Sequence, residues 1–276
     1  MASNGKPLSG FLTAVILILL TALMVPAAWF LPPAWNFIAL MVLMLLFMIT
    51  LGVRISGRPA GILINERNLI SLSRFQLVMW TIIILSAYLT AAIGRIHGGA
   101  IGDALAIGLD PKLWALLGIS TTSLIGTPLL QSTKKAQNPD PKEVAKTETA
   151  LAAKGDPEPK EVIADNSQGV LYANADIKDA AFSDMFEGDE VGNTAYVDVS
   201  KVQMFFFTIV AGLSYGMDLF QWVAAKGYVP ADPKTQAAFP LVSGGLVAIL
   251  GISHAGFLMN KSTTHTPLKV PDVGNK

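Results

Sequence analysis

Long apolar stretches alternate with polar segments along most of the chain. Each of six stretches is long enough to cross about 30 Å of hydrocarbon as a helix, which rises about 1.5 Å per residue. They predict transmembrane helices at 8–31, 36–53, 74–95, 112–130, 201–224 and 239–259. No charged residue lies between Phe11 and Leu31, a run too long for the core of a secretory signal, so we expect the first helix to be retained.

Two sequence patterns each occur twice within the last four stretches. Ser-Arg-Phe-Gln at residues 73–76 recurs as Ser-Lys-Val-Gln at residues 200–203, a spacing of 127. Residues 113–120 recur as residues 246–253, a spacing of 133, and both end in Leu-Gly-Ile-Ser. Since the order is the same both times, the last four predicted helices form a direct repeat of a two-helix hairpin.

The pattern therefore predicts an all-α integral membrane protein with six transmembrane helices and one cytoplasmic insertion. The expected organisation is an N-terminal helix pair at 1–55, a first hairpin at 56–130, a disordered linker at 131–162, a small acidic segment at 163–199, a second hairpin at 200–262 and a polar tail at 263–276.

Composition agrees with a membrane protein, because 52% of the residues are hydrophobic and only 14% are charged. The net charge is zero, yet residues 130–201 hold 14 acidic and 8 basic side chains, so an acidic insertion belongs to a basic membrane body. The chain has no cysteine, which excludes disulfides, thiolate metal sites and a cysteine nucleophile.

Positive charge in short loops predicts the cytoplasmic side of a membrane. The segment between the second and third stretches carries four arginines against the single acid Glu66: Arg54, Arg58, Arg67 and Arg74. We therefore expect both termini to be cytoplasmic as well, in agreement with Lys6, Lys261, Lys269 and Lys276.

The insertion has two parts. Residues 131–162 are rich in proline and mixed charge, which predicts a mobile linker. In 163–199, Ile177, Ala181 and Met185 share one helical face, so we expect an acidic amphipathic helix that docks on protein, because anionic lipid would repel it. Four acids are the candidates for facing Arg58 and Arg67 and for docking a cytoplasmic partner: Asp184, Glu187, Asp189 and Glu190. The alternative is a solvated acidic loop.

The repeated Ser-x-x-Gln pattern fits a capping box at the start of a helix. Ser73 with Gln76, and Ser200 with Gln203, would then satisfy two backbone amides each at the membrane entry. The alternative is a glutamine that bonds to a neighbouring helix. Lys201 is expected to reach into the lipid head groups as an anchor.

Small residues recur at helical spacing in the second helix of each hairpin. Such stripes allow close helix packing in lipid, within one subunit or between subunits of a homo-oligomer, although chance runs of small residues are common. The packing candidates are Ala115, Gly118 and Gly126 in the first copy and Gly244, Ala248, Gly251 and Ala255 in the second.

Hydroxyl side chains gather in the middle of the fourth predicted helix. They can line a hydrated path, or they can bond to carbonyls of their own helix. Likewise His254 can gate a path or share one hydrogen bond with a neighbouring helix, and Asp218 can line an outer mouth or lie in the interface. The pore-lining candidates are Ser120, Thr121, Thr122, Ser123, Ser253, His254 and Asp218.

Catalytic motifs are missing from the sequence. His97, His254 and His265 do not form a ligand cluster, and no phosphate loop or nucleophile elbow is present. The predicted spans offer neither paired acids nor a serine with a base, so we expect neither an enzyme nor a bound metal or cofactor, and no nucleic-acid partner.

The repeated helix opening and the later Leu-Gly-Ile-Ser resemble uncharacterised multi-pass proteins of bacterial inner membranes. The resemblance covers the two hairpins and implies that membrane as the location, without an activity. The leading interpretation is a self-associating passive pore for ions or small solutes. The alternative is a non-conducting scaffold in the lipid bilayer that recruits a cytoplasmic protein through residues 163–199.

Overall fold

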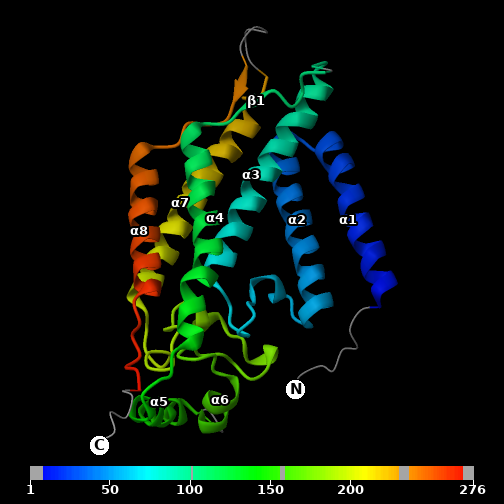
Figure 1. Cartoon of the computed structure of the whole chain (residues 1–276). Coiled ribbons are helices and arrows are strands. Elements are labelled where there is room, and N and C mark those ends of the chain that lie inside the picture. The colour runs from blue at the N-terminus through cyan, green and yellow to red at the C-terminus, as the bar shows by residue number, and fades with distance from the viewer. Residues whose placement is uncertain (1–8, 101, 156–158, 230–235, 270–276) are drawn as a thin grey trace, which may run out of the picture. The chain divides into compact units, whose positions relative to one another are not determined.

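The computed structural model describes residues 9–100, 102–155, 159–229 and 236–269. Lys6, Lys276 and the second half of the predicted polar tail, residues 270–276, lie outside them. The described residues are mostly helical (Figure 1). Their α-helices are α1 (Gly10–Phe30), α2 (Pro33–Ser56), α3 (Leu72–His97), α4 (Pro111–Ser132), α5 (Pro141–Lys154), α6 (Pro159–Asn166), α7 (Val199–Ala224) and α8 (Gly244–Ser262).

Five of these helices are long and apolar enough to cross a membrane: α1, α2, α3, α4 (continued to Ala136) and α7. The chain therefore has the character of a multi-pass membrane protein. The sixth predicted span corresponds to α8, which has 19 residues and is not among those five.

The chain divides into two compact units. Unit 1 contains Met1–Ile62, Phe75–Gly118 and Thr208–Leu250, and unit 2 contains Leu63–Arg74, Ile119–Phe207 and Gly251–Lys276.

In unit 1, α1 and α2 pack side by side as an antiparallel pair (Figure 1). The Asn36 side chain donates a hydrogen bond to the Ala28 carbonyl at 3.2 Å, and Ala28 and Leu40 pack with Ile93 of α3. At the end of α2 the chain folds back on itself. A Cβ atom on Gly52 would lie 2.9 Å from the carbonyl oxygens of Arg58 and Pro59, so only glycine fits.

The helix starts in the two predicted hairpins keep both spacings of the sequence repeat. α3 and α7 have 26 residues each, and their first residues, Leu72 and Val199, are 127 apart. α4 and α8 begin 133 residues apart. The loops inside the two hairpins pair as parallel strands, with Ile107 opposite Ala237 in β1 (Ile107–Gly108) and β2 (Ala237–Ala238).

The predicted capping boxes are wrong, because both helices begin two residues earlier than expected. At α3 the Ser71 hydroxyl accepts the Arg74 amide at 3.5 Å, and the Ser73 hydroxyl is buried without a hydrogen-bond partner in the described part of the chain. At α7 the Asp198 carboxylate accepts the Ser200 amide at 2.9 Å and the Lys201 amide at 3.3 Å.

The two glutamines differ as well. The Gln76 amide donates to the Thr208 hydroxyl, which joins α3 to α7 as the alternative reading expected. Gln203 is exposed.

The prediction of a disordered linker at 131–162 is also wrong, because its described residues contain the 3-10 helix η2 (Thr133–Ala136), α5 and part of α6. Asp140 caps α5 by accepting the Lys142 amide at 2.8 Å, and Gly155 ends it with a φ of 99°. Side chains from these helices join a core with the acidic segment: Leu69, Leu151, Ile163, Tyr172 and Val191.

The acidic segment does not form the expected amphipathic helix. It contains the short 3-10 helices η3 (Ile177–Asp179) and η4 (Phe182–Met185) instead. The acidic side chains explain this difference, because Asp176, Asp179 and Asp184 bond to nearby backbone amides, which competes with a continuous helix.

Candidate functional site

A buried ion cluster in unit 2 centres on Asp189. One carboxylate oxygen lies 2.8 Å from the Arg67 guanidinium and 3.2 Å from the Lys201 ammonium. The other oxygen lies 2.8 Å from the Lys261 ammonium. One acid of the insertion therefore binds the segment before α3, the first turn of α7 and the last turn of α8.

Glu190 extends this cluster to the residues that follow α4. One of its carboxylate oxygens lies 2.5 Å from the Lys134 ammonium. The other accepts the backbone amides of His265 at 2.8 Å and Thr266 at 2.7 Å. The glutamate is thus fully bonded, although only 1% of it is exposed. We call Arg67, Lys134, Asp189, Glu190, Lys201 and Lys261 the ion cluster.

The electrostatics of the ion cluster favour the charged form of Asp189 despite its burial. Burial alone would raise the pKa of Asp189, but the positive charges of Lys201, Lys261 and Arg67 outweigh that effect and hold the pKa well below its usual range. Four cations and two carboxylates share this interior, so the ion cluster has a formal excess of two positive charges.

Three of the four acids predicted to dock a partner, Asp184, Asp189 and Glu190, have carboxylates bonded within the chain, whereas Glu187 contributes a backbone carbonyl. Asp189 forms one of the predicted pairs, with Arg67, whereas Arg58 belongs to unit 1. The Asp184 carboxylate accepts the amides of Ile70 and Ala181, both at 2.9 Å, and burial raises the pKa of Asp184. The Glu187 carbonyl accepts the Lys201 ammonium at 2.5 Å.

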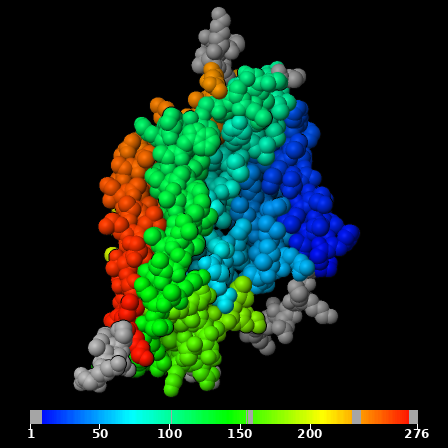
Figure 2. All heavy atoms as spheres, in the orientation of Figure 1, coloured from blue at the N-terminus to red at the C-terminus, as the bar shows by residue number. Residues whose placement is uncertain are grey.

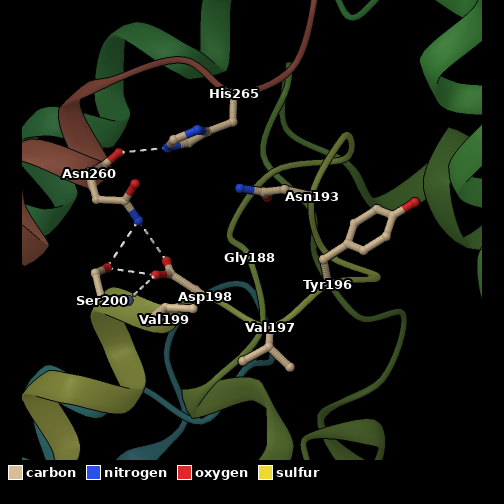
Figure 3. A pocket seen from close by; sticks show the side chains of 9 residues that line it. All are labelled: Gly188, Asn193, Tyr196, Val197, Asp198, Val199, Ser200, Asn260 and His265. Atoms are coloured by element: carbon tan, nitrogen blue, oxygen red, sulfur yellow. Dashed lines mark hydrogen bonds between the residues drawn. The ribbon is translucent and has the colours of Figure 1, made fainter.

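A half-open pocket of about 290 Å³ lies beside the ion cluster (Figure 3). The Asn260 amide donates to the Asp198 carboxylate at 2.8 Å and to the Ser200 hydroxyl at 3.0 Å, and the His265 ring bonds to the Asn260 carbonyl at 3.0 Å. These bonds form one polar wall. The pocket is lined by Gly188, Asn193, Tyr196, Val197, Asp198, Val199, Ser200, Asn260 and His265.

A second polar contact in unit 2 joins α4 to α8. The Ser123 hydroxyl lies 2.6 Å from Nδ1 of the His254 ring, and both side chains are buried. The glycines at 126 and 251 lie beside this contact, where an added Cβ atom would make ordinary van der Waals contact with Leu258 at 3.6 Å and Ile119 at 3.8 Å. Figure 2 shows these parts of α4 (green) and α8 (red) in contact.

The remaining pore candidates do not share one face. Ser120 and Ser253 are buried with the Ser123–His254 pair, whereas Thr121 and Thr122 are exposed on the opposite side of α4. Asp218 is exposed on α7 in unit 1. The four consecutive hydroxyl side chains of residues 120–123 therefore do not line a single path within the chain.

Most small residues predicted to pack are likewise exposed. No atom lies within 4 Å of a Cβ atom built on Gly118. The others on exposed helix surface are Ala115, Gly244, Ala248 and Ala255. Gly126, Gly244 and Gly251 lie beside the partner helix, whereas the rest of the set faces outward, so the whole stripe does not form a packed centre inside one subunit.

A serine hydroxyl bonded to a histidine ring is the first requirement for an activated nucleophile. The expectation that the spans lack a serine with a base was wrong in this respect. The bond alone also serves helix packing in lipid, where a buried polar group needs a partner. Across the residues that the structure describes, no group of three or more His, Asp or Glu side chains could hold a metal ion.

Sequence reasoning missed three of the four basic residues of the ion cluster and predicted only Arg67. Lys201 was expected to anchor in lipid head groups, yet it is buried and bonded to Asp189. Lys134 and Lys261 carried no sequence signal of pairing, since their partners lie 56 and 72 residues away.

Comparison with known proteins gives no relative to this chain: no family model, no curated protein and no solved structure matches it.

Proposed function

We propose that this protein is a membrane scaffold that holds a folded platform at the cytoplasmic surface and recruits a partner there. The platform consists of residues 133–199, as far as the structure describes them, together with residues 263–269. The observation that supports this proposal is the ion cluster. Asp189 binds the platform to three basic side chains next to α3, α7 and α8, and Glu190 binds Lys134 where the platform follows α4.

A flexible tether would not need such contacts. Breaking a buried ion pair leaves an uncompensated charge, so a set of them selects one arrangement of the segments that carry it. Backbone bonds reinforce the platform: the Asp140 amide donates to the Pro267 carbonyl at 2.8 Å, and the Lys269 amide to the Asn138 carbonyl at 3.0 Å.

The same proposal includes a topology. We propose that α8 is a sixth span, that α3–α4 and α7–α8 are copies of one hairpin in the same orientation, and that both termini lie in the cytoplasm of a bacterium. The helix starts support the copied hairpin, because their spacings of 127 and 133 residues are the same as those of the two sequence repeats. The exposed stripe containing Ala115 and Gly118 leaves surface for contact between subunits of a homo-oligomer.

The pocket is the proposed site for the partner, because it combines the exposed aromatic ring of Tyr196 with the polar wall at Asp198 and Asn260. The test replaces Tyr196 with a photoreactive benzoylphenylalanine in intact membranes. A discrete adduct with another protein is expected, and it should vanish when Val197→Trp, a change at an exposed lining residue, fills the pocket. The same replacement at Thr149, which is exposed on α5, is the control. Adducts of equal yield at both positions, or none at Tyr196, would contradict the proposal.

A passive pore is the second candidate, and the buried polar contact between α4 and α8 is the observation that favours it. In addition, the Ser253 hydroxyl is buried without a hydrogen-bond partner in the described part of the chain. Purified protein in liposomes should then pass small ions, and Ser123→Ala should change the flux. Thr122→Val is the control, because Thr122 is exposed. Liposomes that stay impermeable would rule out the pore and leave the scaffold.

A further inference from the structure

An aromatic cluster connects the platform to α7. The Phe182 and Phe186 rings lie 6.2 Å and 5.1 Å from the Phe205 ring, measured between centroids, and all contacts are edge-to-face. The cluster is not closed on its outer side, because 60% of Phe182 and 59% of the adjacent Phe206 remain exposed.

The position of Phe205 in α7 sets the depth of this cluster. Phe205 lies six residues after the first residue of α7, so its ring is about 9 Å along the helix axis from that end. α7 has the length and composition of a membrane span. The head-group layer is about 5–8 Å thick on each side of the hydrocarbon. A side chain that packs on Phe205 therefore lies at the level where head groups meet acyl chains.

The exposed side of Phe206 continues into the lipid-facing surface of α7. Val210, Leu213 and Met217 follow it at spacings of four, three and four residues, and each is more than half exposed. The aromatic cluster is thus the cytoplasmic end of an apolar stripe that belongs to a membrane-spanning helix.

The acid within η4 does not oppose contact of η4 with lipid. Asp184, the acid within η4, points inward and accepts backbone amides of Ile70 and Ala181. Only 9% of Asp184 is exposed, whereas Phe182 in the same 3-10 helix points outward. The sequence alone suggested repulsion by anionic head groups, but the fold hides this charge and presents the aromatic ring.

We infer that η4 is a membrane-contacting element, in which Phe182 inserts into the boundary between head groups and acyl chains beside α7. The occupant of this patch is lipid, because the patch is continuous with the apolar stripe of α7. The platform would then rest on the bilayer itself. This inference requires α7 to span the membrane and does not require a recruited partner, so it can fail or hold independently of the scaffold proposal.

The test uses the absence of cysteine, since single-cysteine variants can carry a nitroxide without background. Phe182→Cys, Ser183→Cys and Thr149→Cys are labelled in the full-length protein in phosphatidylcholine and phosphatidylglycerol vesicles. The rate at which the nitroxide collides with oxygen, which concentrates in lipid, is compared with the rate at which it collides with a water-soluble nickel chelate. Ser183→Cys keeps Phe182 in place, and Thr149 on α5 is the aqueous control.

We expect the ratio of oxygen to nickel collision at 182 and 183 to exceed that at 149 several-fold. Phe182→Ser combined with the 183 label should lower the ratio toward the control value. Equal ratios at 183 and 149 would overturn the inference. A second copy of the chain on the patch would also overturn it. That copy would exclude both reagents, and its own label would broaden the nitroxide spectrum until unlabelled protein is added.

Discussion

Replacing Asp189 with asparagine tests the ion cluster most directly. Asn keeps the size of the side chain but removes the negative charge that faces Arg67, Lys201 and Lys261. The three cations would then share a buried site without their common carboxylate, since none of them is more than 8% exposed. The substitution therefore leaves uncompensated charge in the interior.

Removing one partner of a buried pair destabilises a protein by about 3–5 kcal/mol. Asp189 serves three cations, which favours the upper part of this range. A buried lysine can become neutral by releasing its proton, which limits the loss of stability. We therefore expect Asp189→Asn to lower the unfolding free energy of unit 2 by about 3–5 kcal/mol near neutral pH, and the defect to shrink at alkaline pH.

The assay must report on unit 2, which contains none of the five tryptophans. Ala180 is 2% exposed in the insertion, so Ala180→Cys provides a buried thiol in a chain without other cysteines. Its labelling rate in increasing urea gives the free energy of opening. Asp176→Asn is the matched control, because Asp176 pairs with Lys178 at 3.7 Å on the surface, and its loss should change stability by less than about 0.5 kcal/mol.

A second variant separates charge from packing. Adding Lys261→Met to Asp189→Asn removes one of the stranded cations and should restore part of the stability. A change below about 1 kcal/mol for Asp189→Asn, equal to that of the surface control, would refute the argument that the ion cluster holds the platform.

Three further predictions concern other contacts. Gln76→Leu removes the bond to Thr208 and should lower the stability of unit 1 by about 0.6–2 kcal/mol, measured by tryptophan fluorescence on heating; Gln203→Leu, which is exposed, should have no effect, and equal losses would contradict the contact. Gly52→Ala should destabilise unit 1 in the same assay, because its Cβ atom would lie 2.9 Å from backbone oxygens, whereas Gly118→Ala on an open helix face should be neutral or stabilising; the reverse order would refute the close approach. The pKa of Asp189 is lowered in the fold, so its contribution to stability is complete above the ordinary value of 3.8 and is lost as pH falls below it; melting followed by circular dichroism should show this slope in the native chain and not in Asp189→Asn.

The membrane helices were the most predictable part of the fold. Predicted starts at 74 and 201 compare with observed starts at Leu72 and Val199, because long apolar periodicity is a local property of the sequence. The register of the caps was less predictable. Ser71 and Ser73 both precede the apolar run, and the pattern predicts a cap at Ser73, whereas the Ser71 hydroxyl accepts the amide in the first turn.

The sequence contains local start and stop signals for α5, but the composition of the surrounding segment predicts disorder. Asp140 followed by Pro141 fits an N-cap and the first helical position, and Gly155 fits a left-handed stop. The proline and mixed charge of residues 131–162 favoured disorder instead. What composition could not show is the partner of the helix, since the Thr147 hydroxyl donates to the Val191 carbonyl 44 residues later.

The site was predictable in its acids and in one of its four basic residues, Arg67. The match of Asp189 with Arg67 followed from the excess of acid in the insertion and of base before α3. Lys134 and Lys261 gave no such hint, because a lone basic residue after a membrane helix is also what a lipid anchor looks like. Only the fold distinguishes a buried lysine from one that reaches lipid.

The ion cluster also decides which experiments can test a scaffold. Asp189 and Glu190 are adjacent in the chain, yet between them they bind segments next to α3, α4, α7 and α8. Deleting 163–199 would therefore strand four cations and damage the helix ends together with the platform. Loss of a partner after such a deletion would say nothing about recruitment. Substitutions at the pocket rim, such as Tyr196, leave the ion cluster intact, so they are the variants that separate recruitment from folding.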